Sequence, residues 1–171
     1  MQQEEFIKKI VPIKDKMYRL AKRILISHDE AEDAVQEVFA KILKDTAILK
    51  SVKNHEAFAM TMIKNYCLDR LKSKQASNLT LVHSNYTQET RSLEKQIEAE
   101  EGAGMVFEII KKLPEHHRII LQLRDVEGYE YQEIAKIVEM NETAVRVTLS
   151  RARKAVREAY LKKQNYGLTK S

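Results

Sequence analysis

The last third of the chain contains two amphipathic segments separated by a very short break. Residues Tyr131–Val138 and Glu142–Arg157 each carry apolar side chains at steps of three and four, which is helical periodicity. Only Glu139, Met140 and Asn141 lie between them. An asparagine at this position can cap the second helix through its side-chain oxygen. The pattern predicts a helix-turn-helix unit, and no other feature constrains the fold of this chain as strongly.

The second of these helices is predicted to have one buried edge and one polar outer face. Val145, Leu149 and Ala152 continue the buried edge at steps of four and three. The outer face carries guanidinium, ammonium, hydroxyl and small apolar groups: Thr143, Arg146, Val147, Ser150, Arg151 and Lys154. A helix fits the major groove of B-DNA, where such groups read base edges and hold phosphates.

Each outer-face side chain suits a particular contact with duplex DNA. We expect Arg146 and Ser150 to read bases, because arginine pairs with guanine and a hydroxyl serves either base or phosphate. Arg151 and Lys154 are expected to hold phosphates, whereas Arg153 and Arg157 are expected to be solvated, each with a partner four residues along the helix. Val147 can touch a thymine methyl group, Thr143 adds a hydroxyl, and Tyr131 is predicted to bond a phosphate near the first helix.

The net charge agrees with a polyanionic partner but does not require one. The formal charge is +5 and the isoelectric point is near 9.2. From Asn141 onward basic residues far outnumber the acidic Glu142 and Glu158. This local excess suggests nucleic acid as a partner. Charge alone leaves open a solvated helix with a basic tail.

Composition predicts an all-α protein of two small domains. Hydrophobic residues make up 43% and charged residues 32%, with only 4 Gly and 2 Pro, which favours helix. Pro12 interrupts the first apolar run, so a helix kinks or begins there. We expect one helical domain over residues 1–74, a flexible polar linker over residues 75–91, and the helix-turn-helix domain over residues 92–171.

Several classes of protein are disfavoured by what the sequence lacks. No HExxH, P-loop or GxSxG motif occurs, and the five histidines show no metal-ligand spacing. We therefore expect no catalytic residues, no metal and no cofactor. The single cysteine, Cys67, lies in an apolar helical pattern, so we expect its side chain to be buried. One cysteine cannot form an internal disulfide, which agrees with a protein of a reducing compartment. Without an 18-residue apolar run or a secretory leader, we expect a cytoplasmic protein that does not insert into membranes.

Four segments resemble the sigma-70 family. Leu113–Ala135 is similar to the opening of sigma region 4, and Val145–Lys154 resembles its recognition helix. Asp29–Phe39 resembles sigma region 2.2, and Ala57–Lys72 is similar to the helix that spans regions 2.3 and 2.4. The order of these segments around a polar linker in so short a chain suggests an extracytoplasmic-function (ECF) sigma factor.

The resemblance implies that the two domains bind different parts of the promoter and of the polymerase. It implies that the chain binds core RNA polymerase, at the β′ coiled coil and the β flap, and that the matching β′-facing residues are Asp33, Gln36, Glu37 and Phe39. It implies that the first domain receives the single-stranded −10 element, for which the DNA-facing candidates are Asn54, Lys64, Asn65 and Arg70. It implies that the helix-turn-helix binds the −35 duplex. An anti-sigma factor is a further partner common in the family.

The sequence departs from the family in two places and leaves two alternatives open. Glu139 stands where the family has Gly, and a left-handed turn there would cost a glutamate on the order of 1 kcal/mol. Phe58 stands where the family has Trp, which keeps the aromatic bulk. Phe39 is as well explained by the core as by a partner. The main rival function is a stand-alone helix-turn-helix regulator, which would bind symmetric half-sites without polymerase.

Overall fold

The computed structural model describes residues 2–77 and 103–169, and the described residues form helices without a strand. The first half of the chain folds into α-helices and one 3-10 turn. In chain order these are α1 (Gln2–Lys9), the 3-10 turn η1 (Val11–Ile13), α2 (Lys14–Leu25), α3 (His28–Lys44), α4 (Ile48–Ser51) and α5 (His55–Ser77). The second half contains α7 (Ala103–Lys111), α8 (Glu115–Leu121), the π-helical turn η2 (Gln122–Val126), α9 (Tyr131–Val138) and α10 (Glu142–Thr169).

The helix boundaries follow from local chemistry. Pro12 lacks a backbone N–H, and the chain forms the 3-10 turn around it, so that a new helix begins at Lys14. The Ser27 hydroxyl accepts a hydrogen bond from the Glu30 amide at 3.3 Å and caps α3. Pro114 occupies the cap position of α8, where a residue without a backbone N–H is tolerated.

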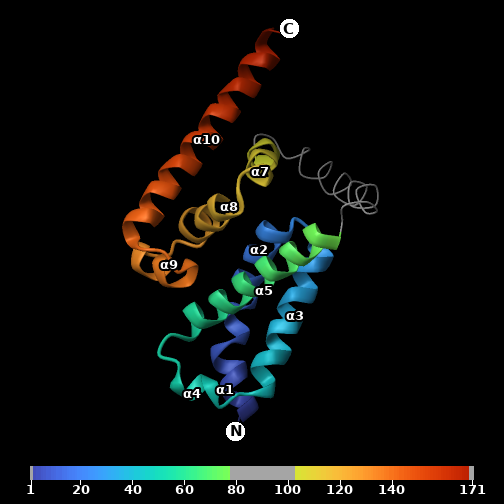
Figure 1. Cartoon of the computed structure of the whole chain (residues 1–171), viewed down its shortest axis with the longest axis vertical. Coiled ribbons are helices and arrows are strands. Elements are labelled where there is room, and N and C mark those ends of the chain that lie inside the picture. The colour runs from blue at the N-terminus through green and yellow to red at the C-terminus, as the bar shows by residue number, and fades with distance from the viewer. Residues whose placement is uncertain (1, 78–102, 170–171) are drawn as a thin grey trace.

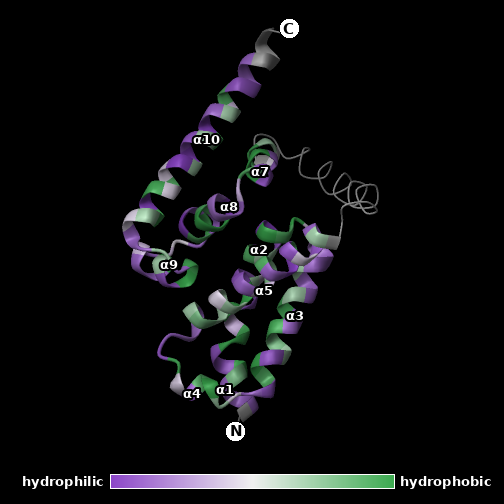
Figure 2. Ribbon diagram, in the orientation of Figure 1, coloured by the Kyte–Doolittle hydropathy of each residue, from purple (hydrophilic) through white to green (hydrophobic). Residues whose placement is uncertain are grey.

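The first half forms a bundle in which α2 packs against both α3 and α5, and α3 packs against α5. Its buried residues include Met17, Leu20 and Ile24 of α2, with Val38 and Ile63 from the neighbouring helices. Figure 1 shows α1 at one end of the molecule and the last turns of α10 at the other. Those last turns are mostly hydrophilic (Figure 2), whereas the first turns of α10 pack against α8 and α9.

The two halves of the chain lie against each other. Helix α2 packs against α8 and η2, and α5 packs against α9. The buried apolar residues of both halves form one continuous cluster. The sequence left open whether the domains associate, and in this structure they do.

The predicted linker falls mostly outside the described residues. Helix α5 continues to Ser77, so residues 75–77, which we expected to begin the linker, are helical. Residues 78–91 of the predicted linker, and the predicted start of the second domain at residue 92, lie outside the part of the chain that is described.

Candidate nucleic-acid interface

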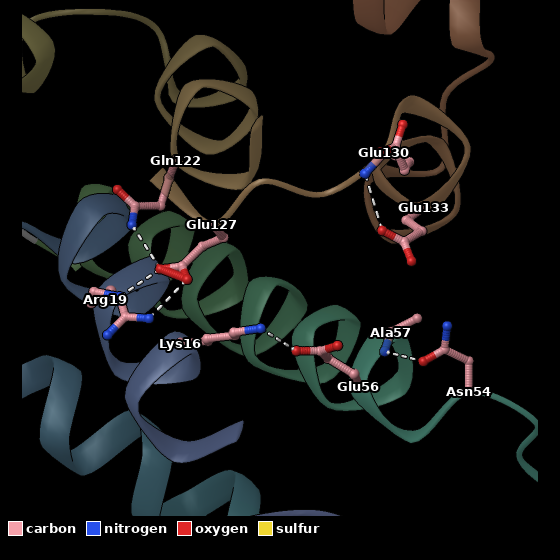
Figure 3. A network of polar contacts seen from close by, with 9 residues as sticks. All are labelled: Lys16, Arg19, Asn54, Glu56, Ala57, Gln122, Glu127, Glu130 and Glu133. Atoms are coloured by element: carbon pink, nitrogen blue, oxygen red, sulfur yellow. Dashed lines mark hydrogen bonds and ion pairs between the residues drawn. The ribbon is translucent and has the colours of Figure 1, made fainter. Parts of the chain in front are cut away.

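The turn between α9 and α10 is built by local hydrogen bonds. At the start of α9 the Glu130 amide donates to the Glu133 carboxylate at 3.0 Å (Figure 3). At its end Glu139 adopts the left-handed conformation, with φ 56° and ψ 44°. The Asn141 side-chain oxygen then accepts from the Ala144 amide at 2.7 Å, so the cap predicted for α10 is present. The chain therefore makes the tight reversal that a helix-turn-helix needs.

Helix α10 exposes the face that the sequence assigns to DNA. Val145, Leu149 and Ala152 are buried, which fixes the rotation of the helix. The six side chains predicted for the outer face are all exposed: Thr143, Arg146, Val147, Ser150, Arg151 and Lys154. Val147 is 42% exposed, so its methyl groups are accessible on this face. Their roles in DNA binding stay predictions.

Tyr131 organises two of the nearby cations. Its ring is half-buried. The Arg146 guanidinium lies 4.3 Å and the Arg124 guanidinium 4.5 Å from the centroid of this ring. Cation–π contacts of this kind restrict a guanidinium without using its N–H groups. The donors of Arg146 therefore remain available for an acceptor outside the protein. The ring of Tyr131 is thus a positioning element, a role that periodicity alone does not indicate.

Two other basic residues of α10 have partners within the protein. Arg153 forms a two-pronged pair with Asp125, at 3.1 and 2.5 Å. The expectation of a solvated Arg153 with a partner one turn along its helix was wrong, because Asp125 comes from η2. Lys154, predicted to hold phosphate, has Glu158 of its own helix at 4.0 Å and stays two-thirds exposed.

Helix α5 presents only part of the face predicted for the −10 element. Asn54 and Asn65 are exposed. The Asn54 side-chain oxygen accepts from the Ala57 amide at 3.0 Å and so caps the start of α5 (Figure 3). Arg70 is half-buried and donates to the Tyr66 hydroxyl at 3.3 Å.

Lys64 is the exception among the predicted DNA-facing residues. It is only 5% exposed, although we expected it to face DNA. Burial lowers the pKa of its ammonium group, and Glu139 at the end of α9 partly opposes that shift. The prediction of a DNA-facing Lys64 does not hold in this arrangement, because α9 packs on α5.

One cluster beside the predicted residues was missed from the sequence. The Lys41 ammonium lies 5.0 Å from the centre of the Tyr66 ring, and Arg70 bonds the hydroxyl of that same ring. An aromatic ring with two cations is a platform on which a nucleic-acid base can stack. The spacing of four residues between Tyr66 and Arg70 could have predicted their contact from the sequence. The position of Lys41, which comes from α3, is seen only in the tertiary structure.

The surface predicted to face polymerase lies on α3. Asp33, Gln36 and Glu37 are exposed on one side of this helix. Phe39 is half-buried and meets the Phe6 ring edge-on, with centroids 5.2 Å apart. Phe39 is therefore packed within the domain and also reaches the surface.

A hollow of about 630 Å³ lies between α7, α8 and α10. Its apolar lining includes Val106, Phe107, Ile110, Val156 and Tyr160. Arg157 of α10 also lines it, and so does Arg23 of α2, whose guanidinium lies over the Phe107 ring. The hollow is thus an apolar groove with a cationic rim, separate from the outer face of α10.

None of the helices in the described ranges is long and apolar enough to span a bilayer.

Comparison with known proteins agrees with both halves of this description. Residues 12–77 match the model of sigma-70 region 2, and residues 104–156 match that of sigma-70 region 4. The chain is 29% identical over 167 residues to the ECF RNA polymerase sigma-E factor of Escherichia coli, covering 90% of this chain and 85% of that protein. It is 28% identical over 164 residues to the RNA polymerase sigma-H factor of Pseudomonas aeruginosa, covering 88% and 83%.

A solved structure has the same fold. The sigma factor RpoE from Bartonella quintana, solved in complex with the anti-sigma factor NepR, superposes with a TM-score of 0.64 at 16% identity, covering 91% of this chain and 96% of that one. With the helix-turn-helix in the matched region 4 and the α2–α5 bundle in the matched region 2, the chain belongs to the sigma-70 family, in its ECF group of RNA polymerase sigma factors.

Proposed function

We propose that this ECF sigma factor recruits core RNA polymerase through α3 and the α7–α8–α10 hollow, and recognises promoter DNA through α10 and α5. The observation that carries the proposal is the exposed outer face of α10, presented after a capped, tight turn and rotated by its buried edge. A packed helix that exposes Arg, Ser, Thr and Val side by side has the chemistry of major-groove recognition.

We assign recognition of the −35 element, as duplex DNA, to α10. Arg146 and Ser150 read base edges, while Arg151 and Lys154 neutralise phosphates. Thr143 and Val147 flank the base-reading pair, and the Tyr131 hydroxyl reaches a phosphate beside α9. The support for this assignment is the exposure of all six α10 side chains and the contact between Arg146 and Tyr131.

We assign recognition of the −10 element, as single-stranded DNA, to α5. Asn65 supplies an amide, Arg70 supplies charge, and the Tyr66 ring with Lys41 supplies a surface for stacking. The Asn54 oxygen is occupied by the Ala57 amide, so its NH₂ group is the part left for a base. Lys64 joins this surface only when α9 has moved away from α5.

Two surfaces are assigned to protein partners. The acidic and amide groups of Asp33, Gln36 and Glu37, with the edge of Phe39, meet the β′ coiled coil, and the apolar hollow takes the β flap. Because the Bartonella quintana relative was solved with an anti-sigma factor, we propose a partner of that kind here as well. Catalysis then belongs to the polymerase, and the factor works in the cytoplasm, where that enzyme acts.

Run-off transcription tests the proposal. Purified core polymerase is assayed on genomic promoter fragments from the source organism, with and without this protein, and a promoter-specific transcript is expected only with it. The matched control replaces Arg146 and Ser150 together by Ala, which leaves the buried edge of α10 intact. A protein that binds symmetric operator half-sites in the absence of polymerase, and adds no transcript, would instead be a stand-alone regulator.

A further inference from the structure

The hollow between α7, α8 and α10 has the size and the lining of a site for a small apolar molecule. Its volume of about 630 Å³ falls within the roughly 300–1,000 Å³ that ligand pockets occupy. Val106, Phe107, Val156 and Tyr160 line it and are only partly buried, so part of their apolar surface stays accessible to solvent. An apolar chain that covers this surface removes it from water, which favours binding.

A guanidinium group with unused donors lies beside this apolar lining. Arg23 of α2 lines the hollow, and its guanidinium carbon lies 4.6 Å from the centre of the Phe107 ring. Its Nε atom donates to the Gln122 side-chain oxygen at 3.1 Å. Within residues 2–77 and 103–169, its two terminal NH₂ groups donate to no acceptor and no carboxylate pairs with it. Such groups form a planar fork that matches the two oxygens of a carboxylate.

The lining carries positive charge that its own carboxylate does not offset. Asp125 is the acidic residue of the lining, and Arg153 already holds both of its oxygens, at 3.1 and 2.5 Å. Arg118 also lines the hollow and donates to backbone carbonyls. Burial lowers the pKa of the Arg23 guanidinium, and the positive charge of Arg118 lowers it further. Arg157 is exposed and forms no ion pair among the described residues. An anion in the hollow would therefore be favoured over a neutral molecule of the same shape.

From this geometry we propose that the hollow binds a fatty acid anion, with its alkyl chain on the apolar lining and its carboxylate against the terminal NH₂ groups of Arg23. An inorganic anion would pair with the guanidinium but leave the apolar lining uncovered. A neutral chain would cover the lining but leave the charge of Arg23 without a partner. A single chain with one charged end satisfies both parts of the lining.

The bound anion has a consequence for transcription that rests on the proposed function. The β flap is assigned to the same hollow, so a fatty acid anion and the flap compete for it. The factor would then recruit core polymerase less well when the anion is present. The ligand site itself depends only on the lining, the volume and the charges of the hollow.

Decanoate tests the site on the free full-length protein, and decan-1-ol, which has the same chain without the charge, is the matched probe. Calorimetric titration far below the micelle concentration of decanoate should show one molecule bound per protein chain. Decanoate should bind about tenfold more tightly than decan-1-ol, a difference of about 1.4 kcal/mol. Equal affinities for the two probes, or no binding of decanoate, would overturn the site.

Three variants locate the two ends of the bound chain. Arg23→Gln removes the charge and should abolish the tenfold preference for decanoate, while the affinity for decan-1-ol stays nearly the same. Lys162→Gln makes the same change in net charge at an exposed residue of α10 outside the hollow, and both affinities should be unchanged. Val106→Trp fills the hollow and should weaken both probes at least fivefold. Circular dichroism checks that each variant remains helical.

The variants can also contradict the site, each in its own way. A preference for decanoate that persists in Arg23→Gln would show that the carboxylate lies elsewhere. Unchanged binding of both probes to Val106→Trp would show that the alkyl chain lies outside the hollow. If Arg23→Gln loses its helical structure, the comparison of the two probes on the wild type and on Val106→Trp still decides the site.

Run-off transcription with core polymerase tests the competition separately. At a decanoate concentration twice its Kd, the concentration of factor needed for half-maximal transcript should rise about threefold, and decan-1-ol at the same concentration should have little effect. Binding of decanoate without this rise would overturn the competition and leave the site standing. No promoter-specific transcript in the absence of both probes would instead remove the proposed function, and the titrations would still decide whether the hollow binds a fatty acid anion.

Discussion

The Arg146 guanidinium lies over the Tyr131 ring, 4.3 Å from its centroid, and so links the two helices of the helix-turn-helix. The contact restrains an exposed arginine without using its N–H groups as hydrogen-bond donors. A side chain restrained in this way loses less conformational freedom when it binds a base than a freely rotating one.

Replacing Arg146 by Ala should relax the specificity of one −35 position. If Arg146 makes a two-pronged bond to guanine, the loss is about 1–3 kcal/mol on the preferred sequence and much less on sequences substituted at that position. Competition binding with duplexes that carry single base changes measures both effects. Lys154→Ala is the control, because loss of a phosphate contact weakens all duplexes alike. Equal weakening by Arg146→Ala on every duplex would contradict the base-reading role.

Changes at Tyr131 separate the ring from the hydroxyl. Tyr131→Phe keeps the surface under Arg146, so sequence preference should persist, and affinity should fall by about 1 kcal/mol if the hydroxyl bonds a phosphate. Tyr131→Ala removes the ring and should also blunt the preference at the position that Arg146 reads. The same duplex panel decides between these outcomes. Identical behaviour of the two variants would show that the ring does not position Arg146.

Glu139 holds a backbone conformation that suits glycine. Because φ is 56° at this residue, Glu139→Gly should raise the free energy of unfolding by about 1 kcal/mol relative to Glu139→Ala. The alanine variant removes the same carboxylate and keeps the Cβ atom, so the comparison isolates backbone strain from the charge near Lys64. Urea denaturation followed by circular dichroism gives both values. Equal stability of the two variants would mean that the turn relaxes.

Truncation of Arg118, whose buried guanidinium bonds carbonyls of both domains, should destabilise the protein strongly. Arg118→Ala leaves three carbonyl oxygens without their buried donor, at a cost of about 3 kcal/mol. Arg118→Lys keeps the charge but cannot span three acceptors, so it should recover only part of the loss. Urea denaturation measures the stability, and hydrogen exchange at the end of α2 locates the change. A loss below about 0.5 kcal/mol would show that water replaces the guanidinium.

Cys67 should make the stability of the protein fall in alkaline solution. Burial raises the pKa of its thiol to about 12, with Arg70 opposing the shift. An unfolded thiol ionises near pH 8.5, so above that pH the unfolded state releases a proton that the folded state retains. The free energy of unfolding should therefore drop by about 2 kcal/mol between about pH 8 and pH 10 from this group alone.

The alkaline effect of Cys67 is measured by difference. Tyrosine and lysine groups also titrate in this range, so the slope of wild-type stability against pH is compared with that of Cys67→Ala. The variant is expected to be less stable near neutrality, because a buried side chain is shortened, and to show a shallower decline. Parallel slopes would indicate that the thiol is solvated in the folded protein.

The sequence by itself determined the local architecture and the face of α10. Val145, Leu149 and Ala152 repeat at steps of three and four, so their burial and the exposure of Arg146 and Ser150 follow from helical geometry. Asn141 caps α10 and Pro12 separates two helices for reasons contained within a few residues. The left-handed turn at Glu139 was suggested only by the glycine that the family has at this position, and the structure contains it despite the glutamate.

Only the tertiary structure decided how the two domains meet. Arg118 bonds carbonyls 94 and 95 residues away, and Arg19 pairs with a carboxylate 108 residues away. Lys64 was expected on the surface, and α9 covers it. Helical periodicity and helix caps depend on residues three or four apart, and the geometry of the helix backbone brings those residues together. The packing of two helical domains depends on the complementarity of surfaces built from distant segments. Contacts between such segments follow no repeating pattern that could be recognised in a single sequence.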